Sequence, residues 1–211
     1  MLPANCSREI LIWQYSFLLL RLQHTLPNHD THEITQYTNT IHNLRMLSQR
    51  NLDHELLELS YLLEIRHALQ LNLSTVNIEQ LLSLAEQTSL QNPLRQNHVQ
   101  LSLMRMLFHI LYLTKLGNGH AATAKLREHH QLMDSTNLEE WEVNGKFDVL
   151  ICNGEYKLLF QWFTQPESFV FGYLMSGVIN LPEYSSTKAW NFLVEGVRVV
   201  DSILPSLTTL M

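Results

Sequence analysis

The chain has 211 residues, of which 45% are hydrophobic and only 16% are charged, and its formal net charge is −6. This composition is typical of a globular protein whose polar surface comes mostly from uncharged side chains. The 14 basic residues are scattered without a run of Lys or Arg, which excludes the basic stripe that direct nucleic-acid binding requires.

The amino-terminal segment contains an apolar run, Ile10–Leu20, which is too short to span a bilayer. We interpret it as part of a buried helix. The only cysteines, Cys6 and Cys152, are far apart in the chain. This pair indicates reduced thiols in a cytosolic or nuclear protein rather than a disulfide framework.

Six helices are predicted before residue 135, because leucine is frequent, glycine and proline are scarce, and apolar residues recur every three or four positions. They form three hairpins at about 8–50, 54–90 and 95–133. The six predicted helices are Arg8–Leu26, Asp30–Arg50, His54–Leu71, Val76–Leu90, Arg95–Leu116 and His120–Met133. The connections contain Pro27-Asn28, Ser74 or Thr75 as the N-cap, Asn92-Pro93 and Gly117-Asn118-Gly119.

Residues 135–154 have the weakest helical pattern and are predicted to form an irregular insertion. Within it, Leu138–Val143 could form a short helix, and Lys146–Ile151 is predicted to be the only extended segment. Three further helices are predicted at Glu155–Phe163, Ser168–Leu181 and Ser186–Ile203, in hairpins at about 155–181 and 186–203. Pro205 is expected to end the last helix.

A pattern of small and apolar residues repeats after 67 positions. Gly177 is followed by Ala189, Leu193 and Gly196, at the spacing of packing positions in a tetratricopeptide repeat. Ala122, Leu126 and His129 lie in the same register, and Asp134 and Asp201 are predicted just after the second helix of each repeat. A small residue is required where the helices of a hairpin cross closely, so Ala122, Gly177 and Ala189 are predicted to be buried. The fold class is therefore predicted to be all-α, a tetratricopeptide-like α-solenoid forming a single domain over residues 1–211.

Eleven histidines raise the possibility of a metal site, and the densest clusters are His29-Asp30-x-His32 and His129-His130. Neither matches a known ligand spacing, and adjacent histidines on a helix point in different directions. Glu139, Glu140 and Glu142 are interpreted as a solvated charge cluster. No nucleophile or phosphate-binding motif is present, so we expect no enzyme activity, no metal and no cofactor.

Aromatic residues recur at helical spacing and are interpreted mainly as packing between repeats, with a minority lining a concave binding face. They are Tyr61, Phe108, Tyr112, Trp162, Phe163, Tyr173 and Trp190.

Three motifs in the second half of the chain resemble one family. They are FQWF at 160–163, YLMSGV at 173–178, and Lys188-Ala189 followed by Phe192-Leu193-x-Glu195-Gly196. In this order they resemble the tetratricopeptide subunit of the cohesin loader, in a fungal version. The segment from Gly145 to Ile151 looks like the extended insertion that precedes the F-x-W helix of that family, and Gly117–Asp134 is similar to one of its repeats. Members are typically much longer, which indicates a fragment, a truncated gene model or a reduced homologue.

The resemblance implies a non-catalytic adaptor that clasps the extended N-terminal segment of the large HEAT-repeat loader subunit. That pair loads cohesin onto chromatin and supports sister-chromatid cohesion, so the implied location is the nucleus, with the cytoplasm as an alternative. No direct nucleic-acid or membrane binding is expected. The residues alone leave two alternatives open, namely a helical-repeat scaffold unrelated to cohesin and a helical enzyme with a histidine-based site.

The motifs are packing positions, so the resemblance transfers no binding residue. If Met106 takes the fourth position of the Leu101–Asp134 repeat, four neighbours project from its first helix toward the concave side. These candidate partner-binding residues are Met104, Leu107, Leu111 and Thr114. The alternative is that the leucines face the next repeat.

Overall fold

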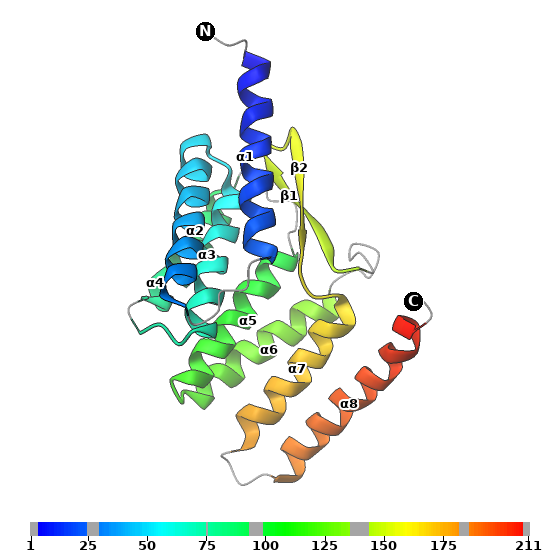
Figure 1. Cartoon of the computed structure of the whole chain (residues 1–211). Coiled ribbons are helices and arrows are strands. Elements are labelled where there is room, and N and C mark those ends of the chain that lie inside the picture. The colour runs from blue at the N-terminus through cyan, green and yellow to red at the C-terminus, as the bar shows by residue number, and fades with distance from the viewer. Residues whose placement is uncertain are drawn as a thin grey trace. The chain divides into compact units, whose positions relative to one another are not determined.

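The computed structural model describes residues 4–24, 30–74, 76–92, 99–135, 144–181 and 186–208. Within these ranges the chain forms eight helices, packed in sequential antiparallel pairs, and one two-stranded sheet (Figure 1). This confirms the predicted helical-repeat fold. Two compact units divide the chain: residues 1–96 with 148–160 form the first, and residues 97–147 with 161–211 form the second. The single domain predicted from the sequence stays a prediction.

The first unit contains four helices in which each packs against the next along the chain. They are α1 (Ala4–His24), α2 (Thr31–Asn51), α3 (His54–Gln70) and α4 (Ile78–Gln91). Asp30 caps α2, since its side chain accepts a hydrogen bond from the His32 amide. Asn77 caps α4 in the same way, which corrects the prediction of Ser74; the other predicted cap, Thr75, lies outside the described residues.

The second unit contains α5 (Val99–Lys115), α6 (Gly119–Ser135), α7 (Gln165–Asn180) and α8 (Ser186–Thr208), again with consecutive helices in contact. The predicted turn between α5 and α6 is confirmed, with Gly117 at a φ of 72°. A capping box formed by Thr164 and Glu167 starts α7, and Pro166 lies in its first turn. The prediction that Pro205 ends the last helix is wrong, because α8 runs to Thr208. Proline removes one backbone donor but does not prevent the next turn from closing.

Strands β1 (Lys146–Ile151) and β2 (Tyr156–Gln161) form a hairpin. The extended segment was predicted, but the helix predicted at Glu155–Phe163 is wrong, as is the hairpin at about 155–181, since α7 pairs with α8. Cys152 and Asn153 have φ values of 53° and 57°, and the Gly154 amide donates to the Ile151 carbonyl at 3.1 Å. These features define a turn with two left-handed central residues, which matches the twist of a β-hairpin. Asn153 and Gly154 are the central residues of an overlapping turn, in which the Glu155 amide donates to the Cys152 carbonyl at 3.3 Å, and this Asn-Gly pair was the sequence signal for the hairpin.

The small-residue register is confirmed in the second unit. Ala122 and Ala189 are 0% and 1% exposed, and Gly177 is also buried. A Cβ atom placed on Gly177 would lie 2.6 Å from Cδ2 and 2.7 Å from Cγ of Leu193. Glycine therefore permits the close crossing of α7 and α8. Asp134 and Asp201 lie inside α6 and α8, not just after them as the repeat register predicted, because α6 extends to Ser135 and α8 to Thr208.

Replacing Gly177 by alanine should lower the free energy of unfolding. Alanine gains up to about 1 kcal/mol of helix propensity, but overpacking against Leu193 costs about 1–3 kcal/mol. Gly119→Ala is the matched control, because a Cβ atom there meets nothing within 4 Å. Urea unfolding followed by circular dichroism should show a lower midpoint for Gly177→Ala only. An unchanged or higher midpoint would mean that α7 and α8 do not cross at Gly177.

Several predictions fall outside the described residues. They are the connections at Pro27-Asn28 and Pro93, the possible helix at Leu138–Val143, the charge cluster at Glu139, Glu140 and Glu142, and the side chains of Cys6 and His29.

Candidate partner-binding surface

The four predicted partner-binding residues lie on α5, but they differ in accessibility. Met104 is 0% exposed and Leu107 is 2% exposed, so the chain itself already covers both side chains. Leu111 is half-buried and packs against a cluster that contains Ile110, Ala122 and Met175. Thr114 is half-buried and donates a hydrogen bond to the Ile110 carbonyl at 2.8 Å. Partner binding by these residues stays a prediction, and only Leu111 and Thr114 present side-chain surface to solvent.

The aromatic residues at the start of α7 form a connected group in the second unit. Trp162 stacks on Phe163 with ring centroids 4.6 Å apart, and it meets Phe108 edge-on at 5.6 Å. Phe163 also contacts Phe171 of α7 at 6.0 Å. The predicted role of most aromatic residues in packing therefore holds here. Trp190, by contrast, is 66% exposed on α8.

Helix α1 has two apolar faces. Tyr15, Leu19 and Leu22 are buried, whereas a second set repeats at intervals of three and four positions on the opposite side of the helix. We call this set the α1 stripe; it consists of Ile10, Trp13, Phe17 and Leu20, which are 44%, 63%, 64% and 54% exposed. The run Ile10–Leu20 is helical as predicted, but it is buried on one face only.

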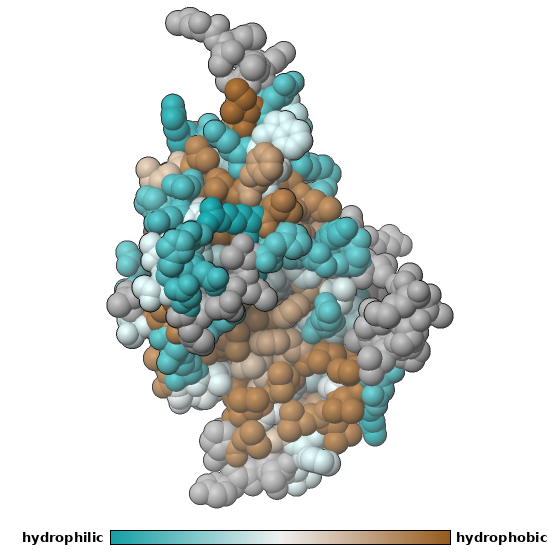
Figure 2. Space-filling model, in the orientation of Figure 1, coloured by the Kyte–Doolittle hydropathy of each residue, from teal (hydrophilic) through white to brown (hydrophobic). Residues whose placement is uncertain are grey.

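Figure 2 shows hydrophobic side chains gathered along α1 in the upper part of the view. Trp13 and Phe17 are neighbours in it, with ring centroids 6.0 Å apart. Large exposed apolar residues that adjoin one another are unusual on the surface of a soluble chain and mark interaction sites. The sequence indicated this surface, because the apolar residues of Ile10–Leu20 spread over more of the helix circumference than one buried face occupies.

A second exposed apolar surface lies on the last helical pair of the second unit. Its members, from α7 and α8, are Leu174, Val178, Trp190, Val197 and Val200. Figure 2 shows a broad hydrophobic area over these helices. Adjoining exposed apolar residues mark interaction sites, so this surface is also a candidate contact.

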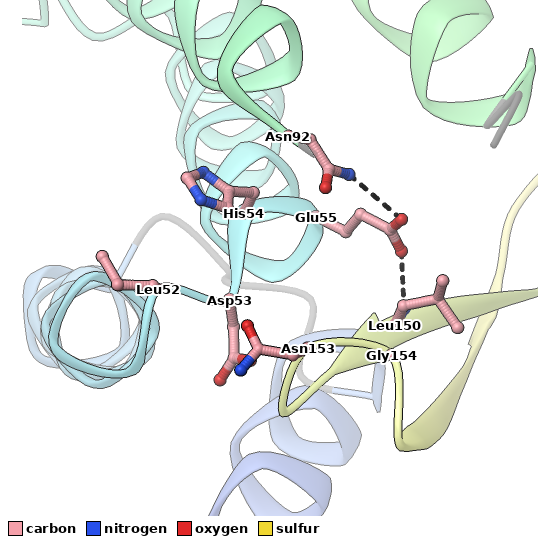
Figure 3. A pocket seen from close by; sticks show the side chains of 8 residues that line it. All are labelled: Leu52, Asp53, His54, Glu55, Asn92, Leu150, Asn153 and Gly154. Carbon is pink, nitrogen blue, oxygen red and sulfur yellow. Dashed lines mark hydrogen bonds between the residues drawn. The ribbon is translucent and has the colours of Figure 1, made fainter. Parts of the chain in front are cut away.

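A polar junction in the first unit attaches the β-hairpin to the start of α3 (Figure 3). Asp53 and Glu55 are 2% and 3% exposed. Their carboxylates accept hydrogen bonds from the backbone amides of Cys152 and Leu150, both at 2.5 Å. Asp53 also accepts from the Tyr15 hydroxyl at 2.7 Å.

The same junction explains two shifted pKa values. Burial, reinforced by the hydrogen bond to Asp53, raises the pKa of Tyr15. Burial also raises the pKa of Asp53, although the bonds from Tyr15 and Cys152 partly oppose that change. The carboxylates of Asp53 and Glu55 both accept hydrogen bonds from protein donors. Their arrangement therefore attaches the hairpin to α3 rather than activating a substrate. No sequence pattern pointed to this junction, because its members are about 40 and 100 residues apart.

The described members of the histidine clusters are not grouped into a ligand set. Among the described residues, no group of three or more His, Cys, Asp or Glu side chains is placed to hold a metal ion. His129 and His130 lie on α6 near Gly172 of α7, where a Cβ atom would come within 3.1 Å of Nε2 of His130. Both rings have a lowered pKa, caused first by burial. They therefore belong to the packing between α6 and α7.

The sequence model of the family described as "Cohesin loading factor" matches residues 3–209. The chain belongs to the cohesin loading factor family. No curated protein and no solved structure matches it. Membership confirms the resemblance seen in the second half of the sequence and extends it to the first hundred residues.

The cohesin loading factor family is one of non-catalytic loader subunits and is associated with the cohesin loading machinery. Phe160-x-Trp162, predicted from the sequence to lie in a helix, is found instead at the end of β2 and in the connection to α7. Phe160 is fully buried, since alternation along a strand directs it to the same side as Leu158. In the parts of the chain that the structure describes, no helix is both long and apolar enough to cross a membrane.

Proposed function

We propose that this chain is a non-catalytic adaptor that binds an extended N-terminal segment of the large HEAT-repeat cohesin-loader subunit. Family membership over residues 3–209 is the observation that carries the proposal. The helical hairpins support it, because stacked hairpins offer long surfaces suited to extended ligands. Through this partner the chain would support cohesin loading onto chromatin and sister-chromatid cohesion, with a nuclear location.

The α1 stripe is the accessible surface that best fits partner contact. Binding energy in protein interfaces is concentrated in a few large residues, among which tryptophan is enriched. Trp13 and Phe17 are exposed by more than half and lie side by side, so a partner could bury them without rearranging the core. Leu111 and Thr114 are the parts of the predicted α5 surface that a partner could still reach.

Replacing Trp13 and Phe17 together by alanine should weaken binding by about 10-fold or more, as loss of a hot spot does. The measurement is fluorescence anisotropy with a labelled, purified N-terminal segment of the large loader subunit. Gln14→Ala is the matched control, since Gln14 is exposed on the same helix. Circular dichroism should show unchanged helicity for both variants, because the replaced side chains lie outside the core.

The results of this experiment distinguish a wrong binding site from a wrong function. Undiminished affinity in the double variant would place the contact elsewhere, for example on α7 and α8. Absence of binding by the unaltered chain, with native purification recovering neither loader nor cohesin subunits, would refute the proposed function. It would favour a helical-repeat scaffold unrelated to cohesin.

A further inference from the structure

The two edges of the β-hairpin in the first unit differ in whether side chains bind their outward-pointing backbone groups. The amide of Leu150, in β1, donates a hydrogen bond to Glu55, and the amide of Cys152, in the turn just after β1, donates one to Asp53, both at 2.5 Å. Alternate residues of a strand direct their backbone groups to the same edge. Side chains at the start of α3 therefore cover the outer edge of β1 at its carboxyl end.

The register identifies the backbone groups at the opposite edge. Since the Leu150 amide is bound to Glu55, alternation directs the backbone groups of Val149 and Ile151 toward β2. Strand β1 ends at Ile151 and β2 begins at Tyr156, so these residues face each other across the turn. By alternation, the N–H and C=O groups of Lys157 and Leu159 then point away from β1.

The outer edge of β2 is accessible. Leu159 is 54% exposed, and no side chain among the described residues forms a hydrogen bond with the backbone of Lys157 or Leu159. A lysine on an edge strand often protects it against pairing. Here the Lys157 ammonium is bound to Asp148 at 2.7 Å, which directs it back across its own hairpin.

From this asymmetry we infer that the outer edge of β2 accepts an extended peptide as a third strand, with an apolar side chain of that peptide beside Leu159. The peptide is a segment of the partner in the proposed function, on which this inference rests. The small area of the edge selects this occupant over a second copy of the chain. A stable dimer needs about 800 Å² from each partner, which a six-residue strand cannot supply. An extended segment makes its remaining contacts elsewhere along its length.

The test uses the full chain and the purified N-terminal segment of the large loader subunit. Leu159→Pro removes an outward-pointing amide, a change that edge strands tolerate. It should weaken binding by about 10-fold or more. Leu159→Thr keeps the amide and the strand propensity, and should bind within about 3-fold of the unaltered chain. In hydrogen exchange, the amides of Lys157 and Leu159 should exchange rapidly in the free chain and become protected on binding.

Each result decides between occupants. If Leu159→Pro does not fold, protection of the two amides in the unaltered chain decides the question. Full affinity of folded Leu159→Pro, or amides that stay unprotected in the complex, would overturn the inference while leaving the proposed function intact. Failure of the unaltered chain to bind the segment would overturn both. Protection that depends on the concentration of the chain alone would identify a second copy as the occupant and overturn the inference.

Discussion

Leu107→Glu is expected to disrupt the second unit rather than to remove a binding contact selectively. Leu107 is 2% exposed on α5, and loss of a buried leucine alone costs about 2–5 kcal/mol. A carboxylate at this position would also lose its hydration without gaining a counter-ion. Because whole domains are stable by only about 5–15 kcal/mol, helicity measured by circular dichroism should fall and the urea midpoint should drop strongly.

Leu116→Glu is the matched control, since Leu116 is 60% exposed just after α5 and its replacement should leave the midpoint nearly unchanged. Adding Leu111→Glu to Leu107→Glu should increase the loss of stability, because Leu111 packs against the cluster around Ile110. The opposite result is informative. Full helicity in the double variant, together with loss of the loader subunit in co-purification, would support Leu107 and Leu111 as members of the partner groove predicted from the sequence.

Stability should fall when the pH is lowered from about 6.5 toward about 4, and His129 should account for much of the change. Burial, with the neighbouring His130, lowers the pKa of His129 from 6.5 to about 4. Both ring nitrogens are buried without a hydrogen-bond partner among the described residues. In this range the unfolded chain binds a proton that the folded chain does not, so acid favours unfolding. The stabilisation is complete above pH 6.5 and is lost as the pH falls to about 4.

The interval between the two pKa values corresponds to about 3 kcal/mol, at about 1.4 kcal/mol per pKa unit. Urea unfolding at a series of pH values should show this slope in the unaltered chain and a weaker slope in His129→Leu, which cannot bind the proton. His120→Gln, at the exposed start of α6, should keep the slope because the buried ring remains. His130 and His67 also have lowered pKa values, so some dependence should persist in His129→Leu. An identical slope in that variant would contradict the assignment.

Local and repeating features of the sequence predicted most of the helical architecture. Helix boundaries before residue 135 differ from the predictions by a few residues, because apolar periodicity and turn residues such as Gly117 act locally. The sequence also predicted the register that links Ala122 with Ala189, since every close crossing of two helices requires a small side chain at the point of contact. The predicted helix at Glu155–Phe163 failed because Asn153-Gly154, a strong hairpin signal, was interpreted only as the end of an insertion.

The sequence by itself determined the helical-hairpin class, its packing register and the family of this protein, because these depend on spacing along the chain. Only the tertiary structure decided which apolar face remains open. Ile10–Leu20 and Met104–Leu111 are both apolar helical runs, yet α1 exposes Trp13 and Phe17 whereas α5 buries Met104 and Leu107. The difference depends on which neighbouring elements cover each helix, and periodicity does not encode this. The junction of Asp53 and Glu55 with the hairpin likewise joins residues about 100 positions apart, and only folding brings them together.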